Sequence, residues 1–371
     1  MGAVEEGPGP ISVADYERRA SEVLDPGAHG YFAGGAGDER TLRENVAAFA
    51  RWRLRPRVLV DVSEVDTRTT VLGEPVSMPI LVAPVAFQRL AHPDGEAGMA
   101  RAAAGAGTVM CVSTLATARP AEVAAAAPEA RLWFQLYCFR DRGVTRALLS
   151  EAVEAGFRAV ALTVDAPRPG RRERDLRSGF RLPAEVGVPS VATATGAQGP
   201  ISVADVLRLV DPALSWDDLE ALVSDSSLPV LIKGVMTAED AVLAADRGAA
   251  GVIVSNHGGR QLDGVAATVD VLGDVAEAVG PGRGADGRRG EAGNRCGNGA
   301  GPRRPGGAGR QARPLGSGGG GYRRRQAGPG AAPRRARAGA GALRLPRARV
   351  GLARPRPAVL LRVPGPLGRR L

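Results

Sequence analysis

The chain of 371 residues has little lysine, cysteine or aromatic side chain. The chain has three cysteines, Cys111, Cys138 and Cys296. Their number is odd, and they lack the spacing of a disulfide framework or a metal site. Residues 1–10 are acidic and contain Gly and Pro, unlike a signal peptide. No apolar run is long enough to span a membrane. These absences argue against a secreted disulfide-rich module, a metalloprotein and a membrane protein, and they favour a reducing cytoplasm.

Lysine is nearly absent, because Lys233 is the single lysine among 49 basic residues. It follows the apolar run 228–232, at the carboxyl end of an expected strand. Barrel and open α/β enzymes place their chemistry at this end of their strands. Lys233 is either a surface residue retained by drift or a cation that the chemistry needs, and its position favours the second interpretation.

The net charge of +10 comes from the C-terminal part of the chain. Residues 281–371 contain 22 arginines and only two acidic residues, whereas residues 1–280 are acidic overall. The C-terminal part is rich in Gly, Arg, Pro and Ala and cannot bury enough apolar surface to offset chain entropy. We therefore expect a folded domain over 1–280 and a disordered basic tail over 281–371, in which the run 358–361 is the one short apolar segment.

Within residues 1–280, short apolar runs alternate with Ala-rich amphipathic segments. Strands are expected at 80–83, 109–112, 133–137, 159–164, 230–232 and 251–254. Helices are expected at 95–106, 121–127, 144–155, 216–223 and 238–247, the last with Thr237 as its N-cap. Apolar strands that alternate with helices are typical of a parallel sheet covered on its faces. Six βα units are recognisable and a (β/α)8 barrel has eight, so the pattern predicts an incomplete α/β (β/α)8 TIM barrel with an irregular basic tail.

The most informative motif is SNHGGRQLD at 255–263, directly after the expected strand 251–254. Its two glycines permit a sharp turn, so that His257 and Arg260 can face one small volume. Histidine can take and return a proton near neutral pH, and the arginine fork matches a carboxylate. A loop histidine that caps the following helix is the alternative. The rest of the chain favours a reaction centre for an anionic substrate.

Polar side chains stand at the ends of successive expected strands. They are Ser113, Thr114, Gln135, Tyr137, Thr163, Asp165, Lys233, Ser255 and His257. Any one of them could be a helix cap. In a barrel, however, all of them would ring one mouth, where (β/α)8 active sites lie.

Five motifs, in order, carry a resemblance to a known family. They are YFAGGAGDE at 31–39, AHPDGE at 91–96, WFQLY at 133–137, TVDAPRPGRR at 163–172 and SNHGGRQLD at 255–263. Over about residues 11–280 the chain resembles the FMN-dependent α-hydroxy acid oxidases and dehydrogenases, which include glycolate, lactate and hydroxymandelate oxidases. Residues 137–141 lean towards the hydroxymandelate oxidase subgroup.

The resemblance implies roles for the catalytic candidates. His257 would remove a proton while two electrons pass to flavin N5, and Asp165 would stabilise the imidazolium. Arg260 and Arg172 would clamp the substrate carboxylate, Tyr31 would add a hydrogen bond, and Tyr137 would lie beside the hydroxyl or nascent keto oxygen. Three alternatives stay open: Asp165 as a cap or an arginine partner, Tyr31 as a core aromatic, and Arg171 in place of Arg172.

The resemblance also implies a set of FMN-binding residues. Lys233 would lie near flavin N1 and O2, where a cation favours the reduced flavin. The flavin and its ribityl chain would be held by the backbone of Pro84, Val85 and Ala86 and by the side chains of Ser113, Gln135, Thr163 and Ser255. Leu115 and Phe87 are expected to line the region of the substrate's side chain, whereas His92 and His29 are expected to pack or cap.

The resemblance ends near residue 281. Family members continue with two further strand–loop–helix units whose loops hold the FMN phosphate, and neither 286–290 nor the glycines at 318–321 have the flanking strand and helix that a phosphate loop requires. The abrupt change of composition, in a chain whose lysine poverty indicates GC-rich codons, is interpreted as translation in a shifted reading frame. The alternative is a genuine basic tail that binds nucleic acid or another acidic surface.

Two functions follow from the sequence. The first is FMN-dependent oxidation of a 2-hydroxy acid to the 2-oxo acid, with oxygen or a quinone as electron acceptor, no specific nucleic-acid or membrane partner, and homo-oligomerisation left open. The second is a catalytically incomplete barrel whose basic tail binds polyanions without specificity.

Overall fold

The computed structural model describes residues 9–183, 185–197, 203–280 and 360–362. The expected disordered, frame-shifted tail lies outside the described residues except at 360–362, as do the segments 286–290 and 318–321. No helix in the described ranges has the length and apolarity needed to span a membrane.

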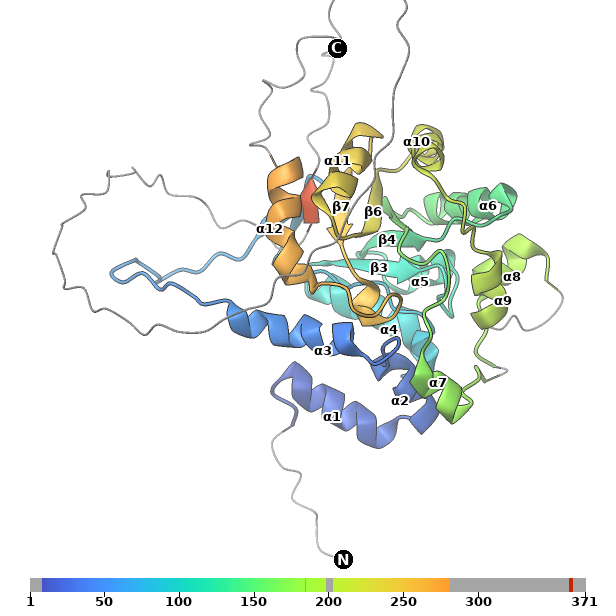
Figure 1. Cartoon of the computed structure of the whole chain (residues 1–371), viewed down its shortest axis with the longest axis horizontal. Coiled ribbons are helices and arrows are strands. Elements are labelled where there is room, and N and C mark those ends of the chain that lie inside the picture. Colours follow the sequence, from blue (N-terminus) through green and yellow to red (C-terminus); the bar gives the residue numbers. More distant parts are fainter. Residues whose placement is uncertain (1–8, 184, 198–202, 281–359, 363–371) are drawn as a thin grey trace, which may run out of the picture. The chain divides into compact units, whose positions relative to one another are not determined.

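The centre of the fold is a sheet of parallel strands in chain order (Figure 1). Its strands are β3 (Val109–Ser113), β4 (Arg131–Leu136), β5 (Ala159–Thr163), β6 (Val230–Val235) and β7 (Gly251–Val254). Each pairs in parallel with the next. Five of the expected strands are thereby confirmed, and the described strands form an open sheet rather than a closed ring.

The expected strand at 80–83 is wrong in extent. Val82 forms only an isolated parallel bridge with Met110, in which the Val82 N–H donates to Val109 O and the Cys111 N–H to Val82 O, each at 2.9 Å. Pro84 lacks an N–H and restricts the residue before it, which limits the ladder to this bridge.

Residues 360–362 are the part of the expected disordered tail that the structure describes. They form β8 (Leu360–Arg362), which pairs antiparallel with β7 in the register Gly251 with Arg362 and Ile253 with Leu360. An edge strand offers unpaired N–H and C=O groups to any extended segment. The direction of β8 is opposite to that of a (β/α)8 barrel strand, so β8 does not stand for a further βα unit.

Helices follow the strands as the sequence predicts. They are α4 (Gly95–Gly105), α5 (Pro120–Ala126), α6 (Arg142–Glu154), α10 (Trp216–Asp225), α11 (Ala238–Asp246) and α12 (Thr268–Val279). Thr237 caps α11 as expected, since its side chain accepts from the Asp240 N–H at 3.2 Å. α4, α6, α11 and α12 pack against the strands, and the residues between sheet and helices form the larger apolar core.

The remaining elements flank this α/β unit. They are α1 (Val13–Val23), α2 (Pro26–Ala33), α3 (Arg40–Ala47), α7 (Glu173–Ser178), α8 (Pro189–Thr195), α9 (Val203–Leu209), the 3-10 turns η1 (Ala48–Arg51), η2 (Gln88–Leu90) and η3 (His257–Gly259), and the antiparallel hairpin β1 (Thr69–Val71) and β2 (Glu74–Val76). α2 packs against α7, and α3 packs against η3 (Figure 1).

The face of the sheet that is turned away from the helices carries two layers of side chains. The first is apolar: Cys111, Trp133, Ala161 and Leu231 form a second core cluster with Val71 and Val76 of the hairpin. Side chains on a strand alternate between faces, so the residue two positions further on shares this face. Those residues are Ser113, Gln135, Thr163, Lys233 and, after β7, Ser255. The strands thus carry a polar layer at their carboxyl ends.

Candidate active site

A cavity of about 310 Å³ lies at the carboxyl ends of the strands. Its walls contain all the predicted catalytic and FMN-binding residues except Asp165, namely Tyr31, Pro84, Val85, Ala86, Ser113, Gln135, Tyr137, Thr163, Arg172, Lys233, Ser255, His257 and Arg260. The structure therefore brings together side chains from segments that are more than two hundred residues apart in the sequence.

Asp165 lies behind the cavity wall, in contact with His257. Its Oδ1 is 2.8 Å from His257 Nδ1, which leaves Nε2 as the ring nitrogen without this partner. Burial lowers the pKa of His257, the hydrogen bond with Asp165 opposes that effect, and the charge of Lys233 adds to it. The lowered pKa keeps the imidazole neutral at pH 7, the state that a general base requires.

The contacts of His257 and Asp165 differ from those expected of a helix cap or of an arginine partner. The His257 ring bonds Asp165, and the capping of η3 falls to Asn256, whose Oδ1 accepts from the Gly259 N–H at 3.2 Å. Asp165 pairs with His257 rather than with an arginine among the described residues, and its other oxygen, Oδ2, is buried without a described hydrogen-bond partner.

Three successive residues of the η3 turn have left-handed backbone conformations. The φ angles are 59° at His257, 66° at Gly258 and 72° at Gly259. A non-glycine residue in this region costs on the order of 1 kcal/mol or more, and such strain persists only where neighbouring structure enforces it. A Cβ on residue 259 would lie 2.5 Å from the backbone nitrogen of Leu42, so that this glycine is required by the close approach of α3.

Two arginines flank the ring of Tyr31. The guanidinium carbons of Arg260 and Arg172 lie 5.0 Å and 5.4 Å from its centroid. Arg260 donates to Gly34 O at 2.6 Å, and burial followed by the charge of Arg172 lowers its pKa. Two cations held this close, on one wall of a cavity, favour an anion between them.

The structure distinguishes Arg172 from its neighbour. The side chain of Arg172 is 14% exposed and lines the cavity, whereas that of Arg171 is 78% exposed and pairs with Glu173. Tyr31 has features of both roles considered for it, a site residue and a core aromatic. Its ring lines the cavity and also packs edge-on against Phe32 and Phe87.

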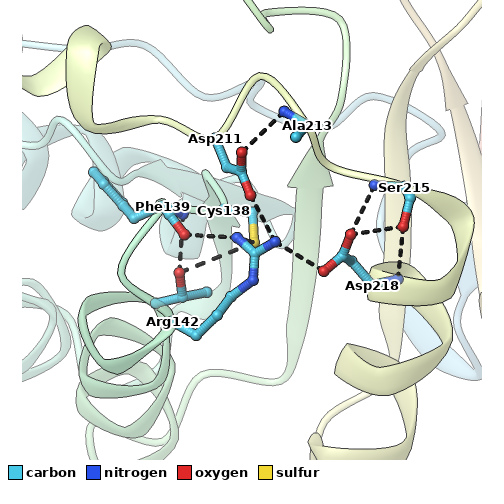
Figure 2. A network of polar contacts seen from close by, with 8 residues as sticks. Cys138, Phe139, Arg142, Asp211, Ala213, Ser215 and Asp218 are labelled. Carbon is cyan, nitrogen blue, oxygen red and sulfur yellow. Dashed lines mark hydrogen bonds and ion pairs between the residues drawn. The ribbon is translucent and has the colours of Figure 1, made fainter.

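Tyr137 follows β4 and is buried in the cavity wall. Burial, and then the charge of Asp165, raises the pKa of its hydroxyl, which therefore stays a hydrogen-bond donor near neutral pH. Arg142 of α6 holds the chain that directly follows Tyr137. Its guanidinium donates to Phe139 O at 2.6 Å and pairs with Asp211 at 2.7 Å and Asp218 at 2.8 Å (Figure 2).

Hydrogen bonds join the side chains of the polar layer to one another. Gln135 Nε2 donates to Thr163 Oγ1 at 2.9 Å, and Gln135 Oε1 accepts from Ser113 Oγ at 3.2 Å and from the Thr114 N–H at 3.1 Å. Lys233 lies in the same layer and forms no salt bridge with a carboxylate of the described residues. An ammonium group without a carboxylate partner among the described residues, beside aligned amide and hydroxyl groups, fits the polar edge of a flavin.

Sequence reasoning missed several residues of this region. Glu96, from the AHPDGE motif, is fully buried and accepts from the N–H groups of Gln88 at 3.2 Å and Thr117 at 2.9 Å, which ties the loop after residue 84 to the chain beyond β3. Leu207 of α9 lines the cavity, and nothing in its local pattern marks it. Leu115 lines the cavity as expected, whereas Phe87 was expected there and is instead buried behind Tyr31.

Comparison with known proteins places this site in a family. Residues 20–285 match the model of the FMN-dependent dehydrogenases. The chain belongs to this family. It is 47% identical to L-lactate oxidase of Nostoc sp. over 73% of this chain and 76% of that protein. It is 49% identical to glycolate oxidase 3 of Arabidopsis thaliana over 72% of this chain and 74% of that protein.

A solved structure of a family relative gives the same fold. Mandelate oxidase with (S)-4-hydroxymandelic acid superposes with a TM-score of 0.68 and 41% identity, covering 73% of this chain and 77% of that one. Because the chain belongs to this family, its fold is that of a (β/α)8 TIM barrel, and the open sheet is part of such a barrel. For the same reason, the cofactor of this enzyme is FMN. The family match ends at residue 285, close to the expected change at 281.

Proposed function

We propose that this chain oxidises a 2-hydroxy acid to the corresponding 2-oxo acid, with FMN as the electron acceptor. The observation that carries the proposal is the shared cavity, in which the paired His257 and Asp165, the two arginines and the polar layer of the strands face one volume. Relatives named lactate, glycolate and mandelate oxidase support the substrate class.

The proposal gives a task to each polar side chain. Arg260 and Arg172 bind the substrate carboxylate with Tyr31 between them. The protonated hydroxyl of Tyr137 donates to the substrate's oxygen as that oxygen becomes a carbonyl. His257 Nε2 takes one proton of the substrate, and the carboxylate of Asp165 at 2.8 Å stabilises the imidazolium that results.

The cofactor would be held by the polar layer and the adjoining loop. When bound, FMN would supply the oxidising power, since it can take up the two electrons and the second proton that the substrate loses. Lys233 would face the part of the ring that becomes negative, and Ser113, Gln135, Thr163 and Ser255 would supply hydrogen bonds. The backbone of 84–86 would cover one face of the ring.

The finer features of the reaction are also proposed. Leu115, Leu207 and Phe32 line the cavity and favour a substrate with an apolar side chain. The oxidase relatives favour oxygen over a quinone as the final acceptor. Cys111 and Cys138 are buried free thiols, which fits a reducing cytoplasm.

A second function is favoured by one observation. Beyond α12, the only element among the described residues is β8, which runs antiparallel to β7. The described residues thus lack the last two parallel βα units, where barrels commonly bind a phosphate. We propose that 1–280 is the catalytic part, that 281–371 is a frame-shifted tail, and that this chain binds FMN weakly. Its alternative role is non-specific polyanion binding by the 22 arginines of 281–371.

The test is anaerobic reduction of added flavin. The full chain is mixed with excess FMN under nitrogen, and a panel of 2-hydroxy acids with small, aliphatic and aromatic side chains is added. Bleaching of the visible flavin absorption, with the 2-oxo acid as product, supports the proposal. Persistent yellow colour at saturating FMN, together with binding of any polyanion irrespective of its sequence, supports the alternative role.

A further inference from the structure

The turn that presents His257 is held from α3 by a reciprocal pair of side-chain amides. Asn45 Nδ2 donates to Asn256 Oδ1 at 2.9 Å, and Asn256 Nδ2 donates to Asn45 Oδ1 at 2.7 Å. Asn45 belongs to α3, and Asn256 directly precedes His257. The two residues are 211 positions apart in the sequence, so only the tertiary fold brings them together.

The hydrogen-bonding capacity of the Asn256 side chain is fully used. Besides the bonds with Asn45, its Nδ2 donates to Ala266 O at 3.0 Å and its Oδ1 accepts from the Gly259 N–H at 3.2 Å. Asn256 is 5% exposed. A buried amide with both donors and both acceptor positions engaged has one favourable orientation. The same side chain therefore joins α3, the start of the η3 turn and the chain that leaves it.

This connection matters because His257 has an unfavourable backbone conformation. Its φ of 59° lies in the left-handed region, where a non-glycine residue must be held by its surroundings. The Gly259 N–H, which closes the turn, bonds the Asn256 side chain. Nearby, Thr41 of α3 fixes the far end of the loop, because its N–H donates to Asp263 Oδ1 at 2.8 Å and its Oγ1 accepts from the Gly264 N–H at 2.8 Å.

We propose that Asn45 is a positioning residue for the reaction: its amide orients Asn256, which closes the strained turn that aims His257 at the cavity. This role rests on the proposed function of His257 as the base. Asn45 itself does not line the cavity, so it acts only through the amide pair. Asp165, Lys233 and Arg172 are the charged groups that act on His257, and the proposal leaves their roles unchanged.

The test compares Asn45→Asp with the parent chain without FMN. An aspartate places a second acceptor against Asn256 Oδ1, so the turn should loosen and hydrogen exchange over 256–264, followed by mass spectrometry, should become at least about tenfold faster. The chain has three histidines, so side-chain NMR can follow each of them, with the His257 signal identified by its loss in His257→Asn. In Asn45→Asp the pKa of His257 should rise towards the ordinary histidine value, because burial is the main cause of its lowering and a looser turn buries the ring less.

Two further variants make the result decisive. Asn45→Ala removes both amide bonds while favouring the helix, and we expect it to change both readouts in the same direction, with a smaller effect. Arg43→Gln alters an exposed side chain of the same helix and should change neither. Parent-like exchange and titration in both Asn45 variants, or an equal effect of Arg43→Gln, would overturn the proposal. Neither readout needs turnover, so a failure of the proposed oxidation is distinguishable.

Discussion

At the scale of single residues, the chemistry of the site depends on the environment of His257. Burial lowers its pKa, while Asp165 at 2.8 Å partly restores it and fixes which ring nitrogen faces the cavity. Lys233 and the two arginines place positive charge around the base. Lys233 and Arg172, which are proposed to bind the cofactor and the substrate, therefore help to keep the base neutral.

Replacing the base gives a direct expectation. His257→Asn removes the side chain that takes the proton, so flavin reduction by a 2-hydroxy acid should slow by roughly a hundredfold or more. FMN affinity should change little, because the polar layer of the strands is untouched. Stopped-flow absorbance and an FMN fluorescence titration measure the two quantities. His92→Asn is the matched control, since His92 lies outside the cavity and its ring nitrogen Nδ1 accepts from the Asp94 N–H. Near-parent reduction rates in His257→Asn would assign the base elsewhere.

The pH dependence follows from the direction of the shift. The base must be unprotonated, so kcat/KM should rise with pH through the pKa of His257, and this limb should lie below about pH 6.5. Asp165→Asn removes a group that raises the pKa, so the limb should move to still lower pH. The plateau rate should fall because the imidazolium loses its partner. A pH–rate profile at fixed FMN saturation measures both effects. A limb that moved upwards would contradict this account.

At the scale of elements, Gly234 at the end of β6 sets where Asp165 can lie. Its φ is 116°, and a Cβ at this position would lie 2.6 Å from the Asp165 Cβ. Gly234→Ala should therefore displace Asp165 and destabilise the fold by about 1–3 kcal/mol. Gly273→Ala is the control, because Gly273 is helical with nothing within 4 Å of the added Cβ and should stabilise α12 slightly. Urea unfolding with a histidine titration measures both. Equal stability of the two variants would show that Gly234 is not required.

The elements also show how far sequence patterns reach. The strands 109–113 and 251–254 were predictable because uniformly apolar runs ended in polar residues, and α11 was predictable from its spacing and its Thr237 cap. The segment 80–83 had the same apolar character, but the prolines around it reduced it to a bridge at Val82. Patterns of this kind report burial and alternation, and they say less about the length of a ladder.

The residues of the site also fall into those that sequence patterns predict and those that they do not. Most of the cavity walls were predictable because their residues belong to a strand end or to a motif. Asn45 and Leu207 carried no local signal, since their roles depend on a distant partner, Asn256, and on the cavity itself. Glu96 belongs to a motif, but its contact with Thr117 was not predictable from that motif. Long-range polar pairs of this kind follow from the tertiary fold rather than from local periodicity.

At the scale of the whole molecule, the family match stops at residue 285 while the chain continues to 371. A (β/α)8 barrel closes with its last two βα units, and phosphate groups commonly bind in the loops after those strands. The phosphate of FMN carries about two negative charges, and its burial without N–H donors and an arginine is unfavourable. The described residues contain the proposed site for the flavin ring but no such loops after β7, so they offer binding groups for the ring and none of this kind for the phosphate.

Restoring the reading frame after about residue 280 tests this directly. We expect the restored chain to bind FMN at least about a hundredfold more tightly than the present one, because a bound phosphate gains several charge-assisted hydrogen bonds. Riboflavin, which lacks the phosphate, is the matched ligand control and should bind the two chains with similar affinity. Fluorescence titration of both flavins against both chains gives the four constants. Equal FMN affinity in the two chains would show that residues 281–371 already supply a phosphate site, and the frame-shift interpretation would then be wrong.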